Sequence, residues 1–172
     1  MDKGMIQIYT GDGKGKSTAA CGLACRCAGQ GLRVWFVQFL KTGSSGELEI
    51  LRQCEKVTVE CSETKKFVWD MTPQEVKQET QECGKFFEKI KKQAGQYDLI
   101  VLDEIMGCLQ NGFLQETLVA DFLRGKPEQT ELVLTGRNAP ASLVGLADYV
   151  TEMQEVKHPM NCGVPARRGI EF

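Results

Sequence analysis

Apolar residues in this chain fall into short runs separated by polar and glycine-rich stretches, a pattern that predicts alternating strands and helices. Residues 5–9 alternate between apolar and polar and predict a half-buried strand. Residues 32–40 are almost continuously apolar, which is typical of a parallel strand buried on both faces. Between them, residues 15–28 are rich in Ala, Cys and Leu and predict a helix that ends at the glycines of 29–31.

The same alternation continues along the rest of the chain. The clearest helix start is Thr72, a good N-cap whose capping box is completed by Glu75, and this helix is predicted to reach about residue 93. Further helices are predicted at 47–53, 114–123 and 141–146, and further strands at 57–60, 97–104, 131–135 and 149–155. Alternating elements of these lengths predict one α/β domain over 1–172, with a doubly wound, mostly parallel sheet of about six strands.

Composition and charge narrow the range of partners. The 172 residues carry a formal net charge of −2, with a pI near 5.6, so the chain has no basic field for nucleic acid. The longest apolar run, 32–40, is too short to span a membrane and contains Arg33 and Gln38. Only five residues precede Ile6, so we expect no signal peptide and a cytoplasmic protein.

Eight cysteines raise the question of disulfides or a metal site. Cys21, Cys25 and Cys27 lie in the first predicted helix, where neighbouring turns are a poor frame for a disulfide, and no Cys-x-x-Cys occurs. The single histidine, His158, is far away in sequence and is expected to be structural. We interpret the cysteines as small apolar residues in a reducing cytosol, with a metal site as the weaker alternative.

A glycine-rich loop between the first strand and the first helix is the strongest candidate for chemistry. Strand, glycine loop and helix together form the context of a phosphate-binding loop, in which backbone amides and the helix N-terminus bind anions. Lys16 is predicted to reach the phosphates and Ser17 to ligate Mg²⁺. The motif departs from the usual one because a threonine stands at its first position; a plain surface turn is the alternative. The predicted ATP-binding residues are Thr10, Gly11, Asp12, Gly13, Lys14, Gly15, Lys16, Ser17 and Thr18.

A second motif lies at the end of the strand predicted at 97–104. Its apolar run ends in Asp103 and Glu104, the Walker B pattern in which an acid at the strand tip holds the metal ion. Alone this pattern more often marks a solvated strand end, but paired with the glycine loop it indicates a P-loop fold with Mg-ATP. Arg137 and Asn138 follow another strand, where nucleotide contact and a solvated turn are both possible.

These motifs, in their order along the chain, resemble those of the P-loop-type ATP:corrinoid adenosyltransferases. The resemblance includes the loop at 10–20, the strand at 31–40, Leu102-Asp103-Glu104 and the segment 134–140, and it extends through 147–153, 157–159 and 166–172. It implies transfer of the 5′-deoxyadenosyl group of ATP to the Co(I) of a corrinoid, with release of triphosphate. It also implies Mg²⁺ or Mn²⁺ as cofactor, an electron-donating flavoprotein as partner and a homodimer.

The resemblance assigns roles to individual residues. Lys16 and Glu104 would act on the leaving triphosphate, Glu104 as a metal or water ligand together with Ser17 and Asp103. Phe67 and Trp69 match the aromatic pair that displaces the lower axial ligand of the corrinoid, although the residues before them differ from the family pattern. The alternative for both rings is ordinary core packing. Arg167 and Arg168 have two alternatives, contact with the corrinoid or the triphosphate and exposure to solvent.

Two other functions fit a P-loop protein. A kinase or ATPase would release ADP rather than triphosphate, and it would need an acceptor site or a water-orienting residue. An ATP-dependent regulatory switch would bind nucleotide but no corrinoid. Neither accounts for the resemblance, so an adenosyltransferase is the preferred interpretation.

Overall fold

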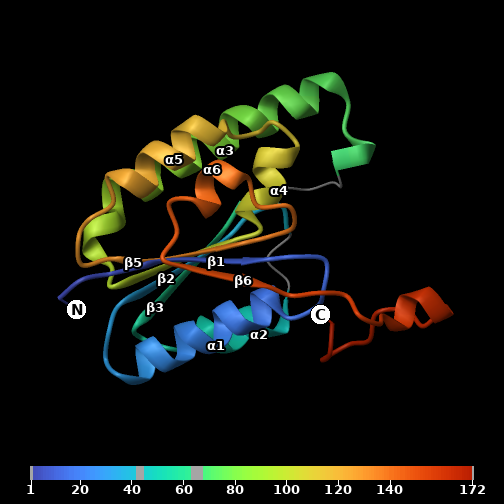
Figure 1. The fold of residues 1–172 in the computed structure, drawn as a ribbon, viewed down its shortest axis with the longest axis horizontal. Coiled ribbons are helices and arrows are strands. Elements are labelled where there is room, and N and C mark those ends of the chain that lie inside the picture. Colours follow the sequence, from blue (N-terminus) through green and yellow to red (C-terminus); the bar gives the residue numbers. More distant parts are fainter. Residues whose placement is uncertain (1, 42–44, 63–67, 172) are drawn as a thin grey trace.

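The computed structural model describes residues 2–41, 45–62 and 68–171. Its centre is a six-stranded sheet in the order β3-β2-β4-β5-β1-β6, and every strand runs parallel to its neighbours (Figure 1). The strands are β1 (Ile6–Thr10), β2 (Val34–Gln38), β3 (Val57–Cys61), β4 (Leu99–Asp103), β5 (Glu131–Thr135) and β6 (Tyr149–Glu152). The prediction of a mostly parallel α/β sheet is confirmed, and all of the strand pairs in the sheet are parallel.

Helices cover both faces of the sheet, with α1 and α2 on one face and α3, α4, α5 and α6 on the other (Figure 1). This arrangement is the doubly wound architecture that the alternation of elements predicts. The bounds are α1 (Lys16–Gly29), α2 (Gly46–Leu51), α3 (Pro73–Gln93), α4 (Ile105–Gln110), α5 (Glu116–Arg124) and α6 (Ala141–Val144).

The two faces of the sheet belong to two separate hydrophobic clusters. Along β4, Ile100 and Leu102 pack into the cluster under α3 and α5, whereas Leu99 and Val101 pack into the cluster under α1. Successive strand side chains point to opposite faces, so a strand covered on both sides is apolar at successive positions; in β2 and β4 this holds up to the polar residue at the carboxyl end. Both β2 and β4 are buried along their whole length, and for β2 this confirms the prediction from the continuous apolar run at 32–40.

The strand register brings distant motifs to one edge of the sheet. Gln38 at the end of β2 is paired with Asp103 at the end of β4, and Tyr9 of β1 is paired with Thr135 of β5. Ligands of open parallel sheets bind outside the carboxyl ends of the strands. The glycine loop after β1 therefore begins at the same edge as Asp103 at the end of β4 and Glu104 directly after it.

Element boundaries differ from the sequence predictions in two instructive places. The helix α4 starts immediately after Glu104, where the sequence pattern predicts only the end of a strand. The strand β6 ends at Glu152 rather than at residue 155, because Met153 is hydrogen-bonded to the glycine loop through both its N–H and its carbonyl. The capping box of α3 is confirmed: the Thr72 side chain accepts from the Glu75 N–H, and the Glu75 carboxylate accepts from the Thr72 N–H.

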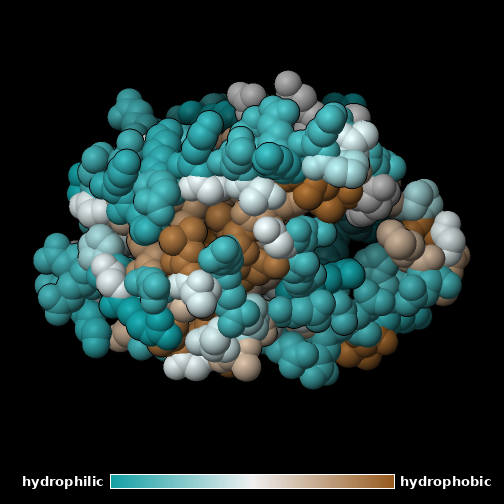
Figure 2. Space-filling model, turned by 90° about the horizontal axis from the view of Figure 1, so that it is seen from above, coloured by the Kyte–Doolittle hydropathy of each residue, from teal (hydrophilic) through white to brown (hydrophobic). Residues whose placement is uncertain are grey.

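Beyond β6 the chain forms an extended C-terminal arm, residues 153–171, which reaches past the edge of the sheet (Figure 1). Nearly all of its residues are exposed, including Val156 and Met160. The face formed by α3, α5 and α6 is mostly polar, with apolar side chains gathered near its middle (Figure 2). Within the described ranges, no helix is both long and apolar enough to cross a membrane.

Candidate functional site

The glycine loop is held in shape by the backbone that follows β6. The Gly13 N–H donates to the Met153 carbonyl at 2.6 Å, and the Met153 N–H donates to the Thr10 carbonyl at 2.8 Å. Gly11 has a φ of +95°, in the left-handed region that favours glycine. A Cβ on Gly11 would lie 2.4 Å from the Met153 carbonyl oxygen, and one on Gly13 would lie 2.7 Å from it. The loop therefore needs these glycines for close approach.

This close approach leads to a paired prediction. Gly13→Ala should lower the free energy of unfolding by about 2 kcal/mol and weaken ATP binding, because residues 153–154 must move away from the new methyl group. Gly22→Ala is the matched control: Gly22 is exposed within α1 with nothing within 4 Å, so alanine should stabilise the protein by about 0.5–1 kcal/mol. Urea unfolding and ATP titration of both variants measure the difference. Equal stability of the two variants would contradict this view of the loop.

Lys16 lies over the loop rather than in open solvent. Its Nζ donates to the carbonyls of Gly11 at 2.6 Å and Gly13 at 2.7 Å, and the residue is only 9% exposed. Burial lowers the pKa of Lys16, and the nearby Glu104 carboxylate opposes that shift. The loop thus encloses a positive charge directly beside the N-terminus of α1, where backbone amides also favour anions.

Asp103 is the most deeply buried charged group at this edge, with no exposed surface. Its Oδ1 accepts from the Thr135 hydroxyl at 2.7 Å, and its Oδ2 accepts from Gln38 Nε2 at 3.0 Å and from Lys41 Nζ at 3.2 Å. Lys41 Nζ also lies 3.4 Å from Ser17 Oγ. The Lys41 ammonium therefore lies within hydrogen-bond distance of both Ser17 and Asp103.

The sequence motifs do not predict Lys41 as a site residue. Its signal was present, since it is the first residue of a polar loop after a buried strand. Its importance depends on the pairing of β2 with β4, which places it next to Asp103.

Glu104 occupies a strained position at the start of α4. Its φ is +63°, which is rare for residues other than glycine, and its N–H donates to the Thr135 hydroxyl at 2.9 Å. Burial and the neighbouring Asp103 carboxylate raise the pKa of Glu104, while the positive charges of Lys41, Lys16 and Arg137 lower it. Unusual backbone conformations of this kind concentrate at functional sites.

Left-handed residues follow three of the central strands at this edge: Leu40 after β2, Glu104 after β4 and Asn138 after β5. Each turns the chain sharply out of the sheet. The turn after β5 brings Arg137 beside the glycine loop, with its guanidinium Nε 3.6 Å from Asp12 Oδ1. The Thr10 hydroxyl accepts from the Ala139 N–H at 3.2 Å and fixes the same turn.

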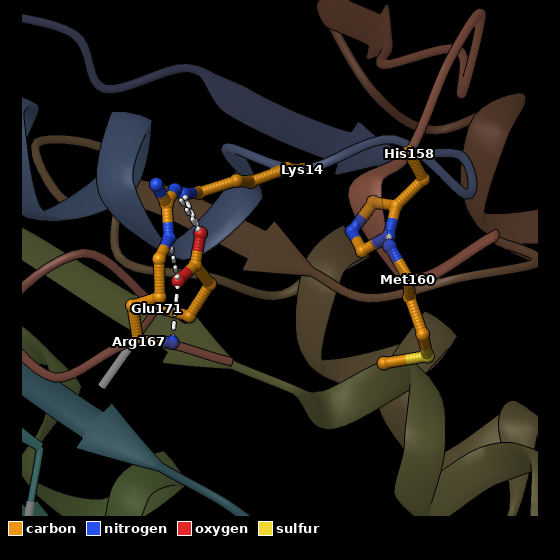
Figure 3. Close-up of polar contacts among 5 residues, drawn as sticks. All are labelled: Lys14, His158, Met160, Arg167 and Glu171. Atoms are coloured by element: carbon orange, nitrogen blue, oxygen red, sulfur yellow. Dashed lines mark hydrogen bonds and ion pairs between the residues drawn. The ribbon is translucent and has the colours of Figure 1, made fainter. Parts of the chain in front are cut away.

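The C-terminal arm returns to the glycine loop through Glu171. The Glu171 carboxylate accepts from Lys14 Nζ at 2.9 Å and from the Arg167 guanidinium at 3.0 Å (Figure 3). Hydrogen bonds from Arg167 and Lys14 lower the pKa of Glu171 to about 2. His158 lies apart from this group, and its Nδ1 accepts from the Met160 N–H, a local contact in agreement with a structural role (Figure 3).

The remaining sequence-predicted residues are Thr18, Phe67 and Trp69. Thr18 is exposed in the first turn of α1. Phe67 is outside the described residues, and Trp69 belongs to the 3₁₀ turn η1 (Val68–Asp70). All eight cysteines are free thiols. In the described part of the chain, no three His, Cys, Asp or Glu residues gather as metal ligands.

Comparison with known proteins connects this geometry to a family. A family model described as ATP:corrinoid adenosyltransferase BtuR/CobO/CobP matches residues 2–172. A corrinoid adenosyltransferase of Sinorhizobium sp is 36% identical, covering 99% of this chain and 81% of the relative, and one of Escherichia coli K12 is 34% identical, covering 99% and 87%. The fold is also similar to a KaiC-like protein of Pyrococcus horikoshii, with a TM-score of 0.53 and 14% identity, covering 88% of this chain and 73% of the other.

Proposed function

The chain belongs to the ATP:corrinoid adenosyltransferase family BtuR/CobO/CobP, and from this premise we propose which of its residues carry the reaction. It is a corrinoid adenosyltransferase, an ATP-binding enzyme of cobalamin biosynthesis. We place the triphosphate of ATP in the loop 10–18, with Arg137 and Asn138 beside it. The observation that carries this proposal is the ammonium of Lys16 enclosed by the loop at the N-terminus of α1.

The reaction that we propose transfers the 5′-deoxyadenosyl group of ATP to the cobalt of a corrinoid and releases triphosphate. The Co(I) nucleophile forms the new bond to the 5′-carbon, and the bond from that carbon to the triphosphate oxygen breaks. No proton has to be removed from the nucleophile, so Glu104 is not needed as a general base. The protein's task is to aim the two reactants and to neutralise the leaving group, for which Lys16 and the loop amides are placed.

The residues around Lys41 fit a divalent cation. Ser17 and the two acids offer hard oxygen donors, and one or two carboxylates together with phosphates are the usual ligands of Mg²⁺. The Lys41 ammonium lies within 3.4 Å of both Ser17 Oγ and Asp103 Oδ2, so this position already attracts positive charge. The amide oxygen of buried Gln38 has no hydrogen-bond partner among the described residues. We propose Ser17, Asp103 and Glu104 as the residues that hold Mg²⁺ or Mn²⁺, which when bound would stabilise the charge of the triphosphate.

Glu104→Gln tests this assignment. Removal of the carboxylate charge should raise the Mg²⁺ concentration for half-maximal turnover by about tenfold, with activity partly recovered at high metal concentration. Glu49→Gln, on the exposed face of α2, should leave the metal requirement unchanged. Full activity of the wild-type enzyme in excess chelator would refute the metal site.

Other features of the proposed enzyme rest on the family resemblance together with the fold. We propose that Phe67 and Trp69 contact the corrinoid and that a flavoprotein supplies the electron. A homodimer is supported by Tyr149 and Val150, which are 57% and 45% exposed on the edge strand β6. One continuous sheet supports a single domain over 1–172, and eight free thiols support a reducing, cytoplasmic location.

A corrinoid spectrum recorded with Mg-ATP under reducing conditions tests the proposed reaction directly. We expect the spectrum of the adenosylated corrinoid to appear with one equivalent of triphosphate. Release of ADP or orthophosphate without a change of the corrinoid spectrum would favour a kinase or ATPase instead.

A further inference from the structure

We propose that Lys41 is a positioning residue. Its ammonium occupies the metal position in the nucleotide-free enzyme, and it moves to pair with the triphosphate when Mg-ATP binds. This inference rests on the ATP site proposed above. Lys41 Nζ lies 3.2 Å from Asp103 Oδ2 and 3.4 Å from Ser17 Oγ, so it contacts two of the proposed metal ligands. A lysine ammonium has only donor hydrogens, so both oxygens act as hydrogen-bond acceptors toward it. The same two oxygens could act as ligands of a metal cation.

The fold directs Lys41 into this position through Leu40. Leu40 has a φ of +55°, a strained conformation for a residue other than glycine, and its N–H donates to the Ser62 hydroxyl at 3.0 Å. Its side chain packs against Gly107, where a Cβ would lie 2.7 Å from Leu40 Cδ1. The turn that precedes Lys41 is therefore held by a hydrogen bond and by close packing against α4.

The buried charge of Asp103 explains why a lysine side chain that can move is useful at this position. Asp103 is fully buried, and Thr135 and Gln38 give it hydrogen bonds but no positive charge. A buried carboxylate is costly unless it is paired with a cation. Lys41 supplies that cation, and its side chain remains 36% exposed, on a flexible stem that leaves it free to move.

A divalent ion on Ser17 and Asp103 must displace the ammonium, because two cations repel each other at such short distance. The triphosphate offers the displaced ammonium a new anionic partner at the same edge of the sheet. Lys41 should consequently have opposite effects on two equilibria: it competes with the metal in the nucleotide-free enzyme, and it assists binding of the metal-bound triphosphate.

Lys41→Met separates these two effects without corrinoid. Mn²⁺ binding to the nucleotide-free variant, followed by electron paramagnetic resonance, should be about three- to tenfold tighter than in the wild type. Binding of inorganic triphosphate with saturating Mg²⁺, followed by calorimetry, should be about tenfold weaker, as expected for loss of one charge-assisted contact. Lys89→Met is the matched control, because Lys89 lies on α3, away from this site, and pairs with Glu60 of β3 at 2.6 Å. Both affinities should stay unchanged in this variant.

Two further variants keep the test decisive. Lys41→Arg keeps the charge and should retain the weak Mn²⁺ binding of the wild type. Lys41→Gln removes the charge but keeps a donor toward Asp103, so it replaces Lys41→Met in both measurements if the methionine variant does not fold. Unchanged or weaker Mn²⁺ binding, or unchanged triphosphate binding, in the folded uncharged variant overturns the role of Lys41. If the wild type binds both probes as expected but never adenosylates a corrinoid, the proposed reaction fails while the role of Lys41 stands.

Discussion

Replacing Lys16 with alanine is expected to lower kcat/KM for ATP by at least about a hundredfold, the size of effect seen when one electrostatic stabiliser of a leaving group is removed. The loop would lose the ammonium that donates to the carbonyls of Gly11 and Gly13, and the triphosphate would lose the nearest positive charge inside the loop. Steady-state kinetics with the corrinoid held in excess measure this loss.

The fold should survive the replacement. The hydrogen bonds that Lys16 gives up are offset by relief from burying a charge, so the free energy of unfolding should change by less than about 2 kcal/mol. Lys77→Ala, on the exposed face of α3, controls for loss of a lysine as such. If Lys16→Ala turned over like the control, the loop would not be the triphosphate site.

Replacing Phe67 or Trp69 with alanine should produce a second large effect, and one that depends on the oxidation state of the corrinoid. If the rings displace the lower axial ligand, they assist reduction of cob(II)alamin and are no longer needed once cobalt is Co(I). Turnover from cob(II)alamin with a weak reductant should fall by at least about a hundredfold, whereas turnover from chemically prepared cob(I)alamin should fall much less.

The two assays distinguish this role from packing. Mg-ATP affinity should stay close to the wild-type value, because the glycine loop comes from other elements of the chain. A core aromatic residue, by contrast, costs about 3–5 kcal/mol when deleted, and both assays would decline together with the melting temperature. Phe86→Ala on α3, beside Phe39, shows what loss of a packing aromatic does in this protein.

The sequence predicts the fold well where local pattern and tertiary environment agree. The apolar run at 32–40 and the acid-tipped run at 97–104 form the buried strands β2 and β4, because a strand covered on both faces is apolar at successive positions rather than at alternate ones. The capping box at Thr72 is likewise a local device, and it is formed as predicted.

The remaining features depend on contacts between distant residues. Lys41 acquires its role only because β2 lies next to β4, with Gln38 opposite Asp103, and no local pattern encodes that register. The sequence pattern does not predict helix α4, because only one left-handed residue, Glu104, separates the end of β4 from the start of the helix. The early end of β6 depends on Met153 binding the glycine loop. In each case the deciding partner is far away in the sequence.

The strand order also governs how this protein can fold on the ribosome. The strand β1, which leads into the phosphate loop, is synthesised first, yet its neighbours in the sheet are β5 and β6. Ile6 pairs with Leu132, so at usual rates of translation β1 waits roughly 6–25 s for its first partner. We therefore expect the nucleotide site to be completed last, after the β2–β3–β4 part of the sheet, and the exposed first strand to be the segment of the nascent chain most in need of a chaperone.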